Sequence, residues 1–172
     1  MLLGLVLLIK GAWFLWDGPA ARHWSIRSLR DPAVTVILLG LASAWFLYKV
    51  MHLGEADFGN YRNLLFTFFL AVAVGSWFFV RDFLAVRAAA ALYLLIAGVL
   101  LDAAFGLYEI PQRLFMVGAV YVGIVFALYL AAVPYRARDM LNWLYINKLR
   151  PRILGGLLAG YGLLLLAVAA TY

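Results

Sequence analysis

Six apolar blocks separated by short polar segments run through this chain of 172 residues. Most of the blocks approach the ~20 residues that an α-helix needs to cross a bilayer at a rise of ~1.5 Å per residue. The sequence therefore predicts an all-α fold, a polytopic transmembrane helix bundle with six spans and no soluble domain. The predicted spans are residues 2–16, 33–54, 64–80, 87–108, 114–134 and 153–171.

Composition agrees with this prediction. Hydrophobic residues make up 67% of the chain and charged residues 13%, with a mean hydropathy of +0.98. Soluble domains are usually only ~45 to 50% apolar, so water is a poor solvent for this surface. Because six spans leave only short connections, we expect residues 1–172 to form a single integral membrane domain.

The loops between the blocks differ in charge, and this difference predicts an orientation. The first, third and fifth connections hold ten of the 14 basic residues. The second and fourth connections contain only Arg62 and Arg113, beside Glu55, Asp57 and Glu109. Lys and Arg accumulate in cytoplasmic loops, so both termini are predicted to lie outside a bacterial inner (plasma) membrane. Insertion thus explains the net charge of +6, and nucleic acid is not an expected partner.

The fifth connection, residues 136–152, mixes large apolar residues such as Trp143 with basic ones. This composition is typical of a short helix that lies in the membrane interface. Anionic lipid head groups at the cytoplasmic face are therefore predicted partners. The expected head-group contacts are Arg136, Arg138, Lys148, Arg150 and Arg152.

Three ionisable residues fall inside predicted spans: Lys10, Lys49 and Asp102. A charge in the hydrocarbon region costs ~2.5 to 3.5 kcal/mol or more, so such positions are the first candidates for a functional role. Asp102 shares a helical face with Gly98 and Gly106, which predicts that another helix covers it. We hypothesise that Asp102 pairs with Lys49 or Lys10, either locking helices together or lining a polar path.

A tryptophan recurs every 32 residues, at Trp13, Trp45 and Trp77. Each is followed four positions later by a charged residue, namely Asp17, Lys49 and Arg81. One interpretation is an aromatic belt at the membrane interfaces, and the other is duplication of a unit of one helix. Between blocks, Asp17, Gly18 and Pro19 are predicted to end the first helix, and Asp31 to cap the second with Pro32 in its first turn.

No motif predicts catalysis, a cofactor or a metal site. The chain has no cysteine, which removes disulfides and thiolate ligands. Its two histidines, His23 and His52, are predicted at opposite membrane faces and cannot hold one haem together. The sequence has no HExxH motif and no serine or threonine with a base at helical spacing.

Small residues at four-residue spacing indicate close helix packing, above all Gly155-xxx-Ala159 and Gly156-xxx-Gly160, with Gly118 and Gly123 in the preceding span. Together these features favour a non-catalytic integral membrane protein that serves as a subunit or assembly partner of a larger membrane complex. The alternative is a small oligomeric transporter or channel with a polar path at Asp102 and Lys49; a membrane-embedded lipid enzyme ranks third. Another membrane protein or a second copy of the chain is the expected protein partner.

Overall fold

The computed structural model describes residues 2–16, 19–79, 82–106 and 109–170. Within these ranges the secondary structure is entirely helical, with no strand. Two short 3₁₀ turns, η1 and η2, connect α3 to α4. The helices are α1 (Leu2–Trp16), α2 (Pro19–Arg27), α3 (Pro32–Met51), η1 (Glu55–Asp57), η2 (Gly59–Tyr61), α4 (Arg62–Phe79), α5 (Leu84–Phe105), α6 (Arg113–Ala132), α7 (Tyr135–Leu144) and α8 (Leu149–Ala169).

Five of the helices, α3, α4, α5, α6 and α8, are long and apolar enough to cross a membrane. A sixth candidate arises if α1 and α2 count as one broken span, because α1 alone has 15 residues and the pair is bent by 118°. The prediction of an all-α fold is confirmed, and five to six helices have the length and hydropathy expected of the six predicted spans. The predicted ends were displaced by up to four residues, most at α8, which begins at Leu149 because Pro151 is tolerated in a first turn.

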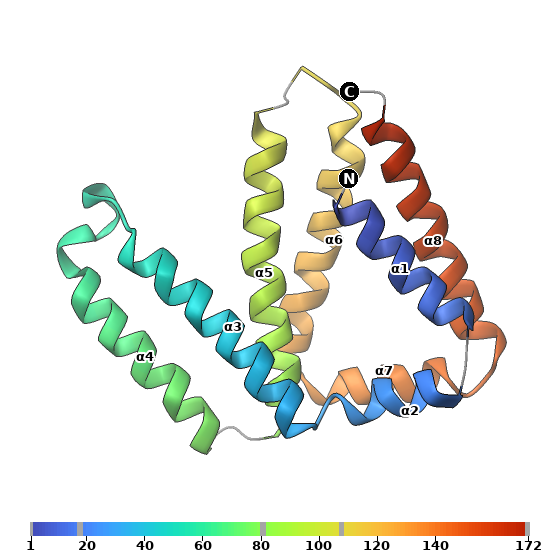
Figure 1. Ribbon diagram of the computed structural model, residues 1–172, viewed down its shortest axis with the longest axis horizontal. Helices are drawn as coiled ribbons and strands as arrows, with labels where there is room; N and C mark the ends of the chain where they lie inside the picture. Colours follow the sequence, from blue (N-terminus) through green and yellow to red (C-terminus); the bar gives the residue numbers. More distant parts are fainter. Residues whose placement is uncertain (1, 17–18, 80–81, 107–108, 171–172) are drawn as a thin grey trace.

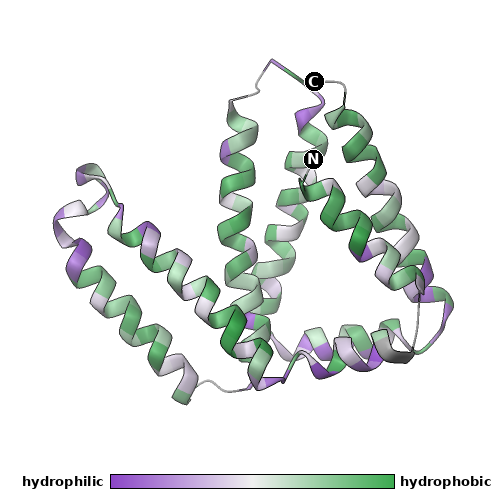
Figure 2. Ribbon diagram, in the orientation of Figure 1, coloured by the Kyte–Doolittle hydropathy of each residue, from purple (hydrophilic) through white to green (hydrophobic). Residues whose placement is uncertain are grey.

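The helices form three groups above a common base (Figure 1). The helices α5 and α6 lie in the middle, the α3–α4 hairpin leans away on one side, and α1 packs with α8 on the other. Two short helices, α2 and α7, lie side by side across one end, which we call the basal end. Figure 2 shows that the long helices are mostly hydrophobic, whereas hydrophilic residues gather on α2 and α7.

A cluster of buried hydrophobic residues lies at the basal end. Phe83 and Val86 at the start of α5 pack with Ala137 of α7, and Leu29 and Leu130 contact this cluster. The α2 helix, which we predicted only as a loop, is joined to α7 by contacts of Tyr145. The Tyr145 hydroxyl shares a hydrogen bond of 3.4 Å with the Ser25 hydroxyl. The Arg22 guanidinium lies 6.0 Å from the centre of the Tyr145 ring.

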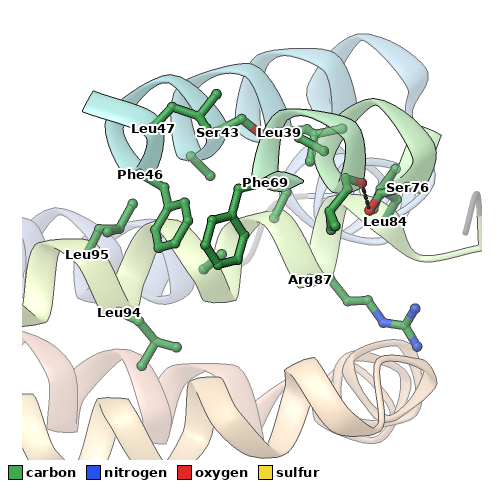
Figure 3. A pocket seen from close by; sticks show the side chains of 15 residues that line it. Leu39, Ser43, Phe46, Leu47, Phe69, Ser76, Leu84, Arg87, Leu94 and Leu95 are labelled. Atoms are coloured by element: carbon green, nitrogen blue, oxygen red, sulfur yellow. Dashed lines mark hydrogen bonds between the residues drawn. The ribbon is translucent and has the colours of Figure 1, made fainter. Parts of the chain in front are cut away.

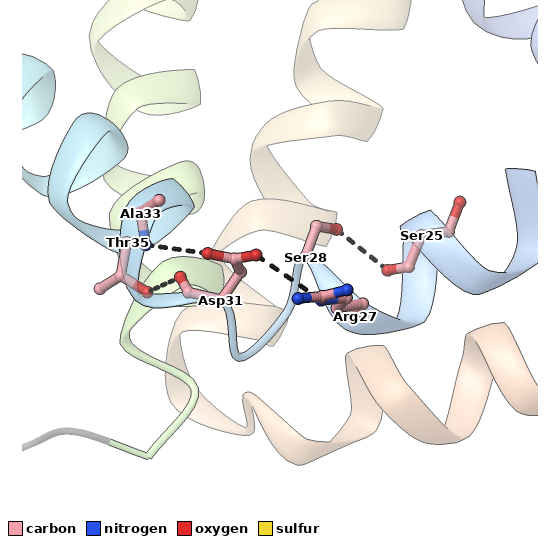
Figure 4. Close-up of polar contacts among 6 residues, drawn as sticks. All are labelled: Ser25, Arg27, Ser28, Asp31, Ala33 and Thr35. Carbon is pink, nitrogen blue, oxygen red and sulfur yellow. Dashed lines mark hydrogen bonds and ion pairs between the residues drawn. The ribbon is translucent and has the colours of Figure 1, made fainter. Parts of the chain in front are cut away.

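The first turn of α3 is capped as predicted. The backbone N–H of Ala33 donates to the Asp31 carboxylate at 2.9 Å, and Pro32 occupies the first turn (Figure 4). The Thr35 hydroxyl donates to the Asp31 carbonyl at 2.8 Å, and Arg27 forms an ion pair with the carboxylate at 3.9 Å. Asp31 therefore connects the end of α2 to the start of α3. Of the residues predicted to end the first helix, Pro19 begins α2, and residues 17–18 lie outside the described ranges.

The antiparallel α1 and α8 pack backbone against backbone through glycines spaced seven residues apart. Gly11 faces Gly155, and a Cβ built on Gly11 would lie 2.7 Å from the Gly155 carbonyl oxygen and 2.5 Å from the Ala159 nitrogen. Gly4 faces Gly162 in the same way, with 2.9 Å between such a Cβ and the Gly162 carbonyl oxygen. Since a side chain at any of these four positions would meet backbone atoms, the pair depends on glycine.

The central pair is held by a tyrosine. The Tyr93 ring of α5 covers Gly123 of α6, and its hydroxyl donates to the Val120 carbonyl at 3.3 Å. At the end away from the base, the Arg113 guanidinium donates to the Ala104 carbonyl at 3.0 Å, which satisfies a free carbonyl at the end of α5.

The α3–α4 hairpin is attached through α3, which packs against both α4 and α5. No residue of α4 is buried. Where α3 meets α4, the Phe46 and Phe69 rings form an edge-to-face pair with centroids 4.9 Å apart. The α4 helix thus has one covered side, toward α3, and otherwise exposes its apolar surface.

Candidate functional site

The structure does not bring the three predicted charge candidates together. Lys10, Lys49 and Asp102 are all exposed, and no ion pair joins them within the described part of the chain. Because α3 ends at Met51 and α5 at Phe105, Lys49 and Asp102 lie in the last turns of their helices, closer to the ends than predicted. A lysine there is favoured by the helix dipole, whereas an aspartate is not.

The expectation that another helix covers the Asp102 face is wrong within this chain. Neither Gly98 nor Gly106 has an atom within 4 Å of the position of a Cβ, so the face they share with Asp102 is open. The same is true of Gly156 and Gly160 on α8 and of Gly118 on α6. The predicted Gly155-xxx-Ala159 stripe is instead the one that packs, against Gly11.

The predicted interfacial segment, residues 136–152, divides into two elements. Tyr135–Leu144 forms α7, which lies along the basal end, whereas Arg150 and Arg152 belong to the first turn of α8. Arg150 donates to the Trp143 carbonyl at 2.9 Å and stacks on its ring at 4.3 Å, which closes the turn between these helices. Arg138 pairs with Asp139 at 3.1 Å, while Arg136 and Lys148 are exposed.

The tryptophans of the 32-residue repeat have different surroundings. Trp13 meets Trp24 edge to face, with centroids 5.8 Å apart, and this contact joins α1 to α2. Trp45 lies in the half of α3 away from the base, and Trp77 lies near the basal end of α4. Of the charged residues that follow them, Asp17 and Arg81 lie outside the described ranges. Both interpretations of the repeat stay predictions.

A cleft of about 530 Å³ lies between α3, α4 and α5. Its walls are apolar: Leu39 and Leu47 come from α3, Val72 from α4, and Ala88 and Leu95 from α5. The Phe46 and Phe69 rings lie side by side within it, and Arg87 lies toward its basal end (Figure 3). The Arg87 guanidinium extends away from the two phenylalanines. The cleft therefore combines a long apolar wall with one cationic group.

Arg87 also lines a second hollow, of about 650 Å³, on the basal side of the first. Asp82, Phe83 and Tyr135 contribute to it. No ion pair within 4 Å links Arg87 to Asp82 or to another described residue. A second cation is near, because the Arg30 guanidinium stacks on the Phe83 ring at 4.5 Å.

This cleft could not be predicted from the sequence, because three helices contribute to it and none of them carries a motif. In the sequence, Arg87 served only as one of the charges that predict the orientation of the chain, although it is the one charged residue among the described residues of the cleft wall. Its position four residues after the buried Phe83, on the same face of α5, was the available clue. In the described ranges, no three histidine or acidic side chains lie together as a metal site.

The arrangement can bind an elongated apolar group with an anionic end; its described residues form no nucleophile–base pair. Comparisons with protein-family models, with curated proteins and with solved structures find no match to this chain.

Proposed function

We propose that this chain is an integral protein of a bacterial inner membrane and acts as a non-catalytic subunit or assembly partner of a larger membrane complex. The long helices expose large apolar side chains along their whole length, for example Val122 of α6, with an exposed fraction of 72%. Contiguous apolar surface of this extent is rarely left in contact with water by a soluble monomer.

The distribution of charge supports an orientation with the base in the cytosol. The end of α1, both short helices and the start of α8 meet at the basal end, while α1 begins and α8 ends away from it (Figure 1). Cytoplasmic enrichment of Lys and Arg then places both termini outside. The described basic residues of the basal end are Arg22, Arg27, Arg30, Arg87, Arg136, Arg138, Lys148, Arg150 and Arg152.

The observation that carries the subunit proposal is the uncovered α4. It has the length and hydropathy of a span, yet none of its residues is buried and its main helix partner is α3. Gly156 and Gly160 leave a second face of small residues open on α8. Elsewhere in the chain, at α1 and α8, glycines bring helices into backbone contact, so an open face of this kind suits a helix from a partner.

The alternative, an oligomeric transporter, needs Asp102 and Lys49 to face a common polar path. Neither residue lines the two hollows between the helices. Both residues are exposed, so the transporter alternative uses a path between copies of the chain, and this gives the two functions different experimental outcomes.

Photo-crosslinking in native membranes separates them. A photoreactive phenylalanine analogue replaces Phe68 of α4, which has an exposed fraction of 58%, and the control places the same analogue at Phe126 of α6, at 46%. A subunit should give an adduct with one different membrane protein from position 68 and not from position 126. The mass of the complex purified in mild detergent provides the second readout.

An adduct with a second copy of the chain, together with the mass of a homo-oligomer, would favour the transporter. Adducts to lipid alone at position 68 would contradict both the subunit and the oligomeric transporter, because each requires a protein neighbour at α4. Recovery of the protein in the soluble fraction after cell lysis would contradict membrane integration itself.

A further inference from the structure

We propose that the cleft between α3, α4 and α5 is a binding site for one anionic phospholipid, with an acyl chain along its apolar wall and the phosphate at Arg87. The proposal rests on the membrane location proposed above and adds a ligand that the proposed function does not require. Three features of the cleft carry it: the composition of its walls, the place of its charge, and its length.

The wall suits an acyl chain. The α4 and α5 helices diverge on either side of α3, and the space between them is bordered by leucines, alanines and two phenylalanines (Figure 3). The Ser76 hydroxyl donates its proton to the Val72 carbonyl within α4 at 2.7 Å. Apart from Ser43, Ser76 and Arg87, the described lining residues are apolar, so methylene groups can pack against most of the wall without facing a polar group.

Charge identifies the end at which the head group lies. Among the described lining residues Arg87 is the only charged side chain, and it makes no ion pair with another described residue. Arg30 adds a second guanidinium beside Phe83, and exposed Asp82 is the acidic group that shares the basal hollow with Arg87. Two guanidinium groups and one carboxylate leave a net positive charge, and guanidinium binds phosphate through paired hydrogen bonds.

The length of the cleft matches one leaflet. From Arg87 to Leu95 the wall follows eight residues of α5, or ~12 Å of helix. Half of the hydrocarbon core of a bilayer measures ~15 Å. Arg87 lies in the first turn of α5. A lipid with its phosphate at Arg87 would thus keep its acyl chain inside the cytoplasmic leaflet, and the end of the chain would lie near Phe46 and Phe69.

Native mass spectrometry of the delipidated full chain tests the site. Phosphatidylglycerol and phosphatidylcholine with the same acyl chains are titrated separately, and the first bound lipid is quantified. We expect one phosphatidylglycerol to bind more tightly than phosphatidylcholine. Arg87→Gln should weaken it by about tenfold, because a charge-assisted hydrogen bond is lost.

Arg22→Gln is the matched control. It removes the same charge from the same end of the molecule, but exposed Arg22 lies on α2, outside the cleft wall. Ala91→Phe tests the acyl site, because Ala91 lines the cleft and a ring there would fill it. Ala91→Phe should weaken the binding of both lipids, while Arg22→Gln leaves binding within about twofold of the parent protein.

Equal weakening by Arg87→Gln and Arg22→Gln would overturn the site, as would equal affinity for the two lipids. Displacement of the bound lipid by millimolar inorganic phosphate would overturn the role of the acyl chain. A protein that stays in the membrane but lacks this selectivity refutes the lipid site alone, whereas a protein found in the soluble fraction refutes the proposed function.

Discussion

The α1–α8 pair and the α3–α4 hairpin are each built from two antiparallel apolar helices, yet they close to different degrees. Four glycines bring α1 and α8 into backbone contact, whereas α3 and α4 meet through the aromatic pair Phe46–Phe69 and leave a cleft beside it. Apolarity alone does not hold helices together in a lipid solvent, where the tails are as apolar as leucine. The size of the residues at the contact therefore distinguishes the closely packed α1–α8 pair from the more open α3–α4 hairpin.

The largest loss of stability is expected from a substitution at Gly11. Gly11→Leu places a side chain against the backbone of α8, and we expect a loss of about 3 kcal/mol in the free energy of unfolding. Gly156→Leu is the control, since nothing lies within 4 Å of a Cβ there and leucine is the better helix former, so it should not lower stability. Denaturant titration in mild detergent measures both, and equal losses would contradict the glycine-dependent contact.

The central helices should show an intermediate effect. Gly123→Ala forces the Tyr93 ring to move and should cost about 2 kcal/mol in the same titration. Gly118→Ala changes the same helix at an open position, where alanine is the better helix former. If Gly123→Ala were as stable as Gly118→Ala, the tyrosine contact would not matter for the α5–α6 pair.

The hairpin is anchored to the base through the start of α3. Asp31→Ala removes the acceptor for the Ala33 N–H and should cost about 1 kcal/mol of unfolding free energy. Asp31→Asn keeps an oxygen in that place and should recover most of the loss. An asparagine variant as unstable as the alanine variant would assign the effect to the exposed ion pair with Arg27 instead.

The smallest effect on stability is expected within the α3–α4 hairpin. In a double-mutant cycle with leucine at Phe46 and Phe69, the coupling energy should be about 1 kcal/mol, as for other edge-to-face pairs. The control cycle combines Phe46 with Phe78, which has no ring contact with it among the described aromatic pairs. Equal coupling in the two cycles would show that the aromatic pair does not define the hairpin.

The long helices are predictable from the sequence because each is a continuous apolar block, and the Asp31 cap is predictable because capping is a local property. The α2 helix was not predicted because nine residues with several charges resemble a loop. The segment nevertheless carries Pro19 at its start and Ala21 and Ser25 on the side that faces α7, which is the pattern of a short surface helix.

Pairing between helices was beyond the reach of the sequence. The spacing of Gly4 and Gly11 matches that of Gly155 and Gly162, but only knowledge that the first and last long helices are neighbours makes the match informative. Asp102 was assigned to a covered face because small residues flank it, although the same pattern occurs on open faces. The cleft is formed by three helices, so the position of Arg87 in its wall could not be predicted before the packing of these helices was known.

The central claim is that these helices cross a membrane with the α2–α7 base in the cytosol. Since the chain contains no cysteine, single replacements at Gly54 and His23 report on one site each. The account predicts that a membrane-impermeant thiol reagent labels Gly54→Cys on intact spheroplasts and labels His23→Cys only after the membrane is permeabilised. Labelling of His23→Cys before permeabilisation, or labelling of both residues from the same side, would contradict it.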